Sequence, residues 1–237
     1  MSDKNRILVG VFSGLVFSGK SFWRERIAAL PSYNEVFQLA MDDIRRRLWG
    51  DKELTKTEHV FKNEATRDEL KTTLIVNKPP AIFLEMVMLT HESHQLPFVK
   101  IINSARCYLQ KIEVEECEKS GVTKPADPIN VDPRIIYFYC DLDAVRRRIK
   151  CRTEELERLG NRFNVDVVNF NGYINAARQM ELPIHYEPLY LDTSNESPEA
   201  QEKQEKEILE FFSGEMPTNY DAARRHQEAS RILEEAR

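Results

Sequence analysis

The residues with the clearest chemical potential lie near the N-terminus, in the stretch Gly14-Leu-Val-Phe-Ser-Gly-Lys-Ser21. The spacing Gly14-x4-Gly19-Lys20-Ser21 fits the phosphate-binding loop (P-loop), in which backbone N–H groups surround phosphate oxygens, a lysine reaches the outer phosphates and a hydroxyl meets Mg²⁺. The chain has only eight glycines in 237 residues, and three of them fall between Gly10 and Gly19. Such clustering is typical of backbone that takes unusual torsions or touches a ligand. The alternative is an ordinary turn with a solvated lysine.

The neighbouring segments supply the context that a P-loop needs, a buried strand before it and a helix after it. Residues 7–12 form an apolar run of strand length, and residues 22–30 follow with alanines, arginines and no helix breaker. Strand, loop and helix together indicate nucleotide binding, and ATP is the nucleotide we expect. The predicted nucleotide-binding residues are Gly14, Phe17, Ser18, Gly19, Lys20, Ser21 and Phe22.

A second polar group follows the next apolar run, which reads VFQLAMDDIRRRL and brings Asp42, Asp43 and Arg45 to the end of a strand. Ligands of open α/β sheets gather at the carboxyl ends of the strands. A carboxylate there can accept the proton of an attacking hydroxyl, and an arginine can hold the substrate or the transferring phosphoryl group. The alternative for Asp42 is a helix N-cap, because aspartate is a favoured cap.

A third carboxylate, Glu85, ends the apolar segment Ala81-Ile-Phe-Leu-Glu85. A glutamate in so apolar a strand needs a partner. We predict that Glu85 and Ser21 hold Mg²⁺ or its water shell, because oxygen ligands suit this cation. A salt bridge from Glu85 to an arginine or lysine is the alternative.

These features resemble the small P-loop kinases of the polynucleotide-kinase and zeta-toxin type. The matching residues are Gly14 to Ser21, followed by Asp42 and Arg45 in the family's Asp-x-x-Arg pattern. The resemblance implies that Asp42 is the general base, with Asp43 as the alternative. It also implies a three-layer α/β fold of the P-loop NTPase and kinase class, in which helices flank a five-stranded, mainly parallel sheet and a helical lid covers the nucleotide.

The lid of such kinases carries arginines after the fourth strand, and here the segment reads CDLDAVRRRIKCRTEELERLGNRFN. Arg148 and Arg152 are four residues apart and therefore share one helical face. The resemblance implies that they close over the nucleotide and stabilise the transferring phosphate. Ordinary surface ion pairs along this helix, such as Lys150 with Glu154, are the alternative. The resemblance also places residues 193–196 beside the adenine.

The sequence departs from the family pattern in two respects. Val16 and Phe17 replace small loop residues, which predicts less space near the phosphates. Phe22 replaces a hydroxyl residue that often touches the α-phosphate, which predicts an altered affinity for the nucleotide. Neither departure removes Lys20 or Ser21.

Apolar runs alternate with helical segments, as in α/β proteins. The predicted strands cover residues 7–12, 36–41, 81–89, 134–141 and 189–193. We expect an amphipathic helix through residues 98–112 that stops near Gly121, an irregular loop TKPADPINVDP, a helix from Ser197 to Gly214 and a charged helix at about 218–236. The predicted domains are a kinase domain at 1–214, with its lid at about 143–180, and a helical extension at 215–237.

Composition limits the partners of this chain. A net charge of −5 argues against broad attraction to long nucleic acid, and no apolar run is long enough to cross a bilayer. The N-terminus leads directly into the first strand, so we expect a cytoplasmic protein without a signal peptide. The four cysteines lack metal-binding spacing. His91 and His94 could share a metal, although a solvated helix start is the simpler interpretation.

The sequence therefore predicts an ATP- and Mg²⁺-dependent kinase that phosphorylates a hydroxyl group. Arg45 to Arg47 favour an anionic acceptor, while the acidic total charge favours a small one. A nucleoside, a nucleotide, a sugar-like metabolite, a nucleotide sugar and a nucleic-acid 5′-hydroxyl all stay open, whereas no membrane partner is expected. The competing class is a nucleotide-binding, slowly hydrolysing interaction protein that engages a partner through residues 107–133 and the C-terminal helix.

Overall fold

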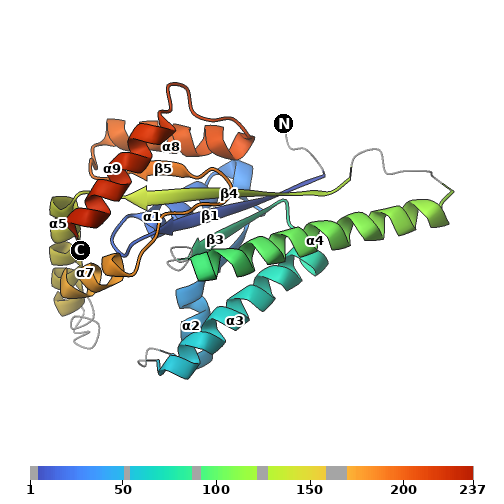
Figure 1. Cartoon of the computed structure of the whole chain (residues 1–237), viewed down its shortest axis with the longest axis horizontal. Coiled ribbons are helices and arrows are strands. Elements are labelled where there is room, and N and C mark those ends of the chain that lie inside the picture. The colour runs from blue at the N-terminus through green and yellow to red at the C-terminus, as the bar shows by residue number, and fades with distance from the viewer. Residues whose placement is uncertain (1–4, 51–53, 87–91, 122–127, 159–169, 237) are drawn as a thin grey trace.

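Five apolar segments of the chain pair side by side into one parallel sheet in the computed structural model (Figure 1). The structure describes residues 5–50, 54–86, 92–121, 128–158 and 170–236, without the side chains of 92–94. The strands are β1 (Arg6–Gly14), β2 (Phe37–Ala40), β3 (Ala81–Met86), β4 (Asn130–Tyr139) and β5 (Leu189–Asp192). Their order is β2-β3-β1-β4-β5, so β1 and the P-loop that follows it lie at the centre of the sheet.

Helices cover both faces of this sheet and complete a three-layer α/β fold. The described helices are α1 (Lys20–Ala28), α2 (Met41–Trp49), α3 (Lys56–Thr72), α4 (Glu92–Lys119), α5 (Leu142–Arg158), α7 (Phe170–Arg178), α8 (Pro198–Ser213) and α9 (Ala222–Glu235), with short turns η1 (Pro31–Tyr33) and η2 (Thr73–Asn77). Helices α1 and α8 pack on one face. Helices α2, α3 and α4 pack on the other, where α5, α7 and α9 cover the carboxyl half of β4 and β5.

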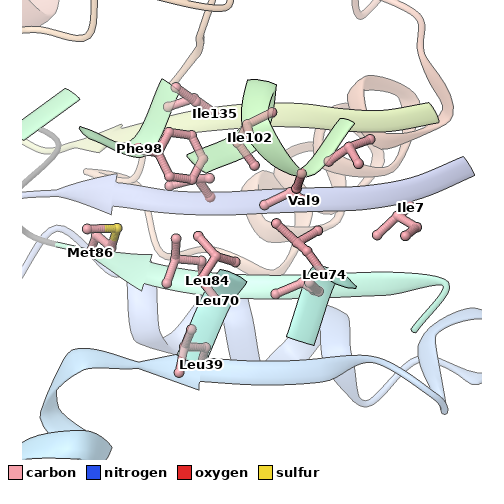
Figure 2. Close-up of a cluster of buried hydrophobic side chains, with 14 of the residues drawn as sticks. Ile7, Val9, Leu39, Leu70, Leu74, Leu84, Met86, Phe98, Ile102 and Ile135 are labelled. Atoms are coloured by element: carbon pink, nitrogen blue, oxygen red, sulfur yellow. The ribbon is translucent and has the colours of Figure 1, made fainter. Parts of the chain in front are cut away.

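The pleat of β1 explains why a continuous apolar run is needed in the middle of the sheet. Val9 and Val11 point toward α3 and α4, and Leu8 and Phe12 point toward α1 and α8. Figure 2 shows the first of these clusters, with Leu70 of α3 among the side chains that meet the strands. Strands buried on both faces read as unbroken hydrophobic segments, as the sequence predicted.

The predicted helix start at Ser197 is confirmed, and side chains also cap a helix that the sequence analysis did not predict. The Ser197 hydroxyl accepts the N–H of Ala200 at the start of α8, and Gly214 ends that helix with a φ of 107°. Thr55 and Glu58 form a reciprocal capping box at the start of α3. Helix α1 differs, because its N-cap is Gly19 and no side chain caps it. Its first N–H groups are therefore left for other partners.

The segment expected to be an insertion at 107–133 is largely regular structure. Helix α4 continues to Lys119, and β4 starts at Asn130, four residues before the predicted strand. Pro133 does not prevent the early start because β5 pairs only with 136–139, which leaves this part of β4 as an edge on that side. The predicted helix stop near Gly121 is correct, with a φ of 72°. Residues 122–127, 87–89 and His91 lie outside the described residues.

The C-terminal helix α9 is attached to the core by apolar and charged contacts. Ala229, Ile232 and Leu233 are buried against β4, β5 and α7. The Arg225 guanidinium donates to both carboxylate oxygens of Glu207 on α8, at 2.6 and 2.9 Å. The weakly apolar pattern of this helix is thus sufficient for docking.

Two general findings concern membranes and cysteines. Within the described ranges, no helix has the length and apolarity needed to cross a membrane. The four cysteines are free thiols, and no cluster of three or more metal-binding side chains occurs among the described residues.

Candidate active site

The P-loop connects β1 to α1 at the carboxyl edge of the sheet, and two of its glycines have conformations that other residues rarely adopt. Gly14 has a φ of 146°, and a Cβ there would lie 2.4 Å from the carbonyl oxygen of Phe138. Gly19 has a φ of 87° and starts α1. These torsions turn the chain sharply, so that the uncapped N-terminus of α1 lies at the end of the central strand.

Lys20 occupies the first position of α1, and its side chain is almost completely buried, with 6% of the residue exposed. Its ammonium donates only to the carbonyl oxygen of Leu15, at 3.3 Å, and forms no ion pair among the described residues. Burial lowers the pKa of Lys20, while the carboxylates of Glu85 and Asp42 act in the opposite direction. A buried ammonium with three donors and one long hydrogen bond requires further acceptors.

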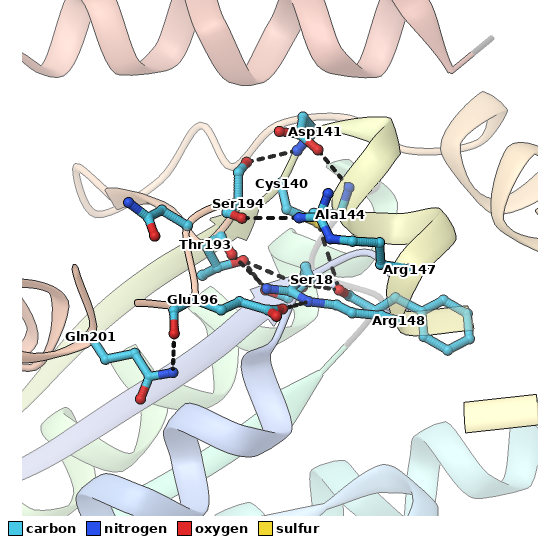
Figure 3. Close-up of polar contacts among 12 residues, drawn as sticks. Ser18, Cys140, Asp141, Ala144, Arg147, Arg148, Thr193, Ser194, Glu196 and Gln201 are labelled. Carbon is cyan, nitrogen blue, oxygen red and sulfur yellow. Dashed lines mark hydrogen bonds and ion pairs between the residues drawn. The ribbon is translucent and has the colours of Figure 1, made fainter. Parts of the chain in front are cut away.

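Arg148 of α5 connects the P-loop to the loop after β5 (Figure 3). Its Nη1 donates to the Phe17 carbonyl at 2.7 Å and to Thr193 Oγ1 at 3.2 Å, while Nη2 donates to the Thr193 carbonyl at 2.5 Å. Its Nε donates to Glu196 Oε1 at 2.6 Å. Thr193 Oγ1 in turn donates to the Ser18 carbonyl at 2.8 Å. Most N–H donors of the Arg148 guanidinium are therefore already bonded to acceptors within the protein.

Phe17, one of the two bulky loop residues, has a φ of 64°, which is rare for a residue with a side chain. Two donors hold its carbonyl in this conformation, Arg148 Nη1 and the thiol of Cys140 at 3.6 Å. Burial raises the pKa of Cys140 to about 11, so its sulfur keeps the proton that it donates. The Phe17 ring packs against the buried cluster under α5, α7 and α9.

A cavity of about 910 Å³ opens at the carboxyl ends of the strands. Its lining residues are Val16, Phe17, Gly19, Lys20, Ser21, Phe22, Trp23, Glu25, Asp42, Arg46, Glu85, Arg148, Arg152, Thr193, Asn195, Glu196, Gln201 and Gln204. The P-loop, the start of α2, the end of β3, α5 and the loop after β5 thus contribute to one site. The structure brings together nearly all of the predicted residues; Gly14, Ser18 and Arg45 do not line the cavity.

Asp42 and Asp43 differ sharply in their surroundings. Asp42 lines the cavity and has no hydrogen bond or ion pair in the described part of the chain. It is not a helix cap, because α2 begins after Ala40 and has no side-chain cap. Asp43 instead lies 3.3 Å from Arg46 and 3.8 Å from Arg24. Only Asp42 presents a free carboxylate to the cavity.

Glu85 at the end of β3 contacts Ser21 and also an arginine, the two kinds of partner that the sequence analysis proposed as alternatives. Its Oε1 accepts the Ser21 hydroxyl at 2.6 Å, and its Oε2 lies 3.5 Å from Nε of Arg24. A hydroxyl and a carboxylate oxygen beside Lys20 fit a Mg²⁺ ion that keeps several waters and also contacts phosphate oxygens. Arg24 offsets part of the charge of Glu85 and leaves Oε1 directed to Ser21.

Arg152 is the second predicted lid arginine, and its position differs from that of Arg148. It lines the cavity one turn further along α5 and is half exposed, and within the described residues its one ion pair is with Glu155 of its own helix, at 2.5 Å. Lys150 and Glu154 form the expected surface pair at 3.9 Å. The centre of the predicted lid, residues 159–169, lies outside the described residues.

Sequence reasoning missed several residues that line the cavity, and also the buried Arg24, which contacts Glu85 but does not line the cavity. Arg24 is buried between Glu85 and Asp43, and Arg46 lines the cavity in place of Arg45. Helical spacing could have found Arg24, because it is four residues after Lys20 and shares its face of α1. No sequence signal indicated Gln201 and Gln204, which reach the cavity from α8.

The similarity of this chain to known proteins lies in its fold. No model of a known protein family matches it, and no curated protein matches it. Solved structures do match. A protein known as APE1195 aligns with 90% of this chain and 98% of its own, at 17% identity and a TM-score of 0.55.

Two kinase structures are similar to this chain. A protein from Chloroflexus aurantiacus J-10-fl with a provisional kinase assignment covers 87% of this chain and 98% of its own, at 12% identity and a TM-score of 0.52. The Mycobacterium tuberculosis APS kinase CysC, solved with AMPPNP and APS, covers 88% and 98% at 14% identity and a TM-score of 0.50. At these identities the likeness concerns the fold, which is the three-layer fold of the P-loop kinases.

Proposed function

We propose that this protein is an ATP-dependent phosphotransferase that transfers the γ-phosphate to a hydroxyl group of an acceptor. The observation that supports this most strongly is the buried, under-satisfied ammonium of Lys20 at the wall of the cavity, with the free carboxylate of Asp42 lining the same space. The first group requires anionic oxygens, and the second can accept a proton. A site for phosphate next to a base is what phosphoryl transfer needs.

Each group of residues has its own role in the proposed reaction. The N–H groups of the P-loop and Lys20 bind the β- and γ-phosphates. Asp42 takes the proton of the acceptor hydroxyl, whose oxygen bonds to the γ-phosphorus as the bond to the β-phosphate oxygen breaks and ADP leaves. Arg152 neutralises charge on the transferring group. Arg148, whose donors already hold Phe17 and Thr193, fixes the shape of the loop.

The nucleotide base has a separate part of the cavity. Asn195 and Glu196 follow β5, and Gln201 and Gln204 come from α8. We place the adenine among them, next to Phe22, which is 47% exposed at the cavity. Ser21 and Glu85 would hold Mg²⁺ through their oxygens, and the ion would supply charge neutralisation at the phosphates.

The test is phosphoryl transfer from Mg-ATP to a panel of acceptors that includes nucleosides, nucleotides, sugars, nucleotide sugars and 5′-hydroxyl oligonucleotides. Asp42→Asn and Asp43→Asn form a matched pair, because they remove the same charge from adjacent positions. We expect Asp42→Asn to lower kcat by about 10²- to 10⁴-fold, the range for loss of a general base. Asp43→Asn keeps kcat within about tenfold, since its carboxylate pairs with arginines and does not face the acceptor.

Equal falls in kcat for Asp42→Asn and Asp43→Asn would show that Asp42 is not the general base. Tight ATP binding without transfer to any acceptor would instead favour a second function, a nucleotide-binding interaction protein. Tyr108 and Val114 on the distal part of α4, 47% and 45% exposed, are the feature that favours it. Helix α9 no longer supports it, because the apolar side of α9 is buried.

A further inference from the structure

Two glutamines of α8 line the cavity, and their amides are bonded differently. Gln201 has both ends of its amide occupied, because Oε1 accepts Nη1 of Arg26 at 3.0 Å and Nε2 donates to the Glu196 carbonyl at 3.1 Å (Figure 3). Gln204 is only 9% exposed, and its Nε2 donates to the Asp192 carbonyl at 2.6 Å. In the described part of the chain, Oε1 of Gln204 has no hydrogen-bond donor, yet it is not fully buried. This oxygen is therefore a free acceptor at the wall of the cavity.

The amide of Gln204 is held in one orientation. A backbone carbonyl oxygen accepts hydrogen bonds and cannot donate them, so the amide nitrogen must face Asp192 and the amide oxygen must face away from it. Asp192 is the last residue of β5 and pairs with Tyr139 of β4, which fixes the position of its carbonyl. A rotated amide would place two acceptors against each other, at the cost of an unsatisfied polar group. The strand therefore keeps the oxygen of Gln204 available as an acceptor.

An acceptor held in this way selects a ligand group that donates. Phosphate oxygens do not suit it, because they are acceptors themselves. The exposed ring of Phe22 lines the same cavity and suits the flat face of a base. Purines differ in the group at position 6: adenine carries an amino group, which donates, whereas guanine and hypoxanthine carry a carbonyl, which accepts. The free oxygen of Gln204 is complementary to adenine alone among these three bases.

We propose that Gln204 determines which purine the site binds, by accepting a hydrogen bond from the 6-amino group of adenine. This inference rests on the nucleotide site of the proposed function and adds base selectivity to it. A 6-oxo purine would place its carbonyl against Oε1, and rotating the amide to avoid this would break the bond to Asp192. Either arrangement leaves an acceptor without a donor, which is how a site discriminates strongly between ligands that differ by one polar group. Gln201 does not take this role, because Arg26 and Glu196 already bond both ends of its amide.

The first test measures binding of three nucleotides to the full chain by calorimetry in the presence of Mg²⁺. They are ATP, inosine triphosphate, which has a 6-carbonyl, and purine riboside triphosphate, which has no group at position 6. We expect the wild type to bind ATP about tenfold or more tightly than inosine triphosphate, with purine riboside triphosphate between them. This comparison needs no variant, so it does not depend on the folding of a mutant. Equal affinities for ATP and inosine triphosphate would overturn the inference.

Two substitutions then test Gln204 itself. Gln204→Met keeps the length of the side chain and removes the amide, so we expect the two affinities to come within about twofold of each other. Gln204→Lys keeps a donor for the Asp192 carbonyl and offers another to a 6-carbonyl, so we expect it to prefer inosine triphosphate. A side chain that only connected α8 to β5 would not reverse the preference. Gln227→Met, the same change at an exposed position of α9, is the matched control and keeps the wild-type ratio. Circular dichroism spectra establish that the variants are folded.

The ratio of affinities is a binding quantity, so it separates base selection from phosphoryl transfer. Wild-type selectivity that persists in both Gln204→Met and Gln204→Lys would assign base selection to another residue and overturn the inference. Selective ATP binding that disappears in Gln204→Met, without transfer from ATP to any acceptor, would contradict the proposed function and still support Gln204 as the base-selecting residue.

Discussion

The two sides of the cavity satisfy their polar groups in opposite ways. On the side of α5 and β5, Arg148, Thr193 and Glu196 form a closed set of hydrogen bonds with the P-loop. On the side of α1 and α2, Lys20 has one long hydrogen bond and Asp42 has none among the described residues. Both sides carry charged residues at the same edge of the sheet.

This difference separates residues that hold the shape of the site from residues that bind ligands. A satisfied, partly buried network fixes geometry, because each donor would lose a partner if it moved. An unsatisfied charge costs stability in the free protein and recovers it on binding. The following predictions test this division, from the largest expected effect to the smallest.

Lys20→Met tests the unsatisfied side most severely. We expect phosphoryl transfer to fall by about 10³-fold or more, because the variant loses the buried lysine of the P-loop. In urea unfolding without nucleotide, we expect the free energy of unfolding of the variant to rise by about 1 kcal/mol, because a poorly satisfied buried charge is removed. A clearly destabilised variant would mean that Lys20 already has adequate partners.

Arg152→Met tests the free arginine of α5. We expect kcat to fall by about 10²-fold with little change in ATP affinity, because in the proposed reaction this half-exposed side chain, paired with Glu155, neutralises charge on the transferring phosphate. Steady-state kinetics and nucleotide titration measure the two quantities. Lys150→Met, which removes a surface pair of the same helix, serves as control with unchanged kcat. Equal kcat values in both variants would exclude Arg152 from the reaction.

Arg148→Met tests the satisfied side. We expect a loss of about 2 kcal/mol in the free energy of unfolding, because the carbonyls of Phe17 and Thr193 lose their donors. The same variant binds ATP more weakly, since Phe17 is no longer held at positive φ. Denaturant titration and nucleotide binding provide the measurements. Unchanged stability with a large fall in kcat would make Arg148 a ligand of the phosphate and erase the contrast between the two sides.

The pH dependence of stability gives the smallest effect. The folded-state pKa of Lys20 lies below its usual 10.5, so above that lowered pKa and up to 10.5 the unfolded chain binds more protons. Stability of the wild type therefore rises with pH in this window relative to Lys20→Met. The advantage of the variant at neutral pH, about 1 kcal/mol, should shrink as the pH approaches 10.5. A constant difference across the window would indicate that Lys20 is not buried as a cation.

The fold was largely predictable because its signals are local. Continuous apolar runs predicted the five parallel strands, and Ser197 with Gly214 predicted the limits of α8. The errors occurred where partners distant in sequence decide the outcome. Pro133 signalled a loop, yet β4 includes it because no strand pairs with that side of β4 at this point.

The site was predictable to the level of motifs. Lys20, Ser21, Asp42, Glu85 and Arg152, all named from the sequence, line one cavity. The sequence could not show that Arg46 and not Arg45 lines the cavity. That depends on which face of α2 is turned toward the cavity, and the rotation of the helix about its axis is set by packing.

The sequence by itself determined the phosphate-binding loop, the five apolar segments that form buried strands, and the residue types at the strand ends. Glycine torsions, caps and apolar runs act over a few residues, so a linear pattern records them. The tertiary structure decided which charged groups find partners, as the contrast between Arg148 and Lys20 shows. Ion pairing and desolvation depend on distances between helices, and packing alone sets those distances.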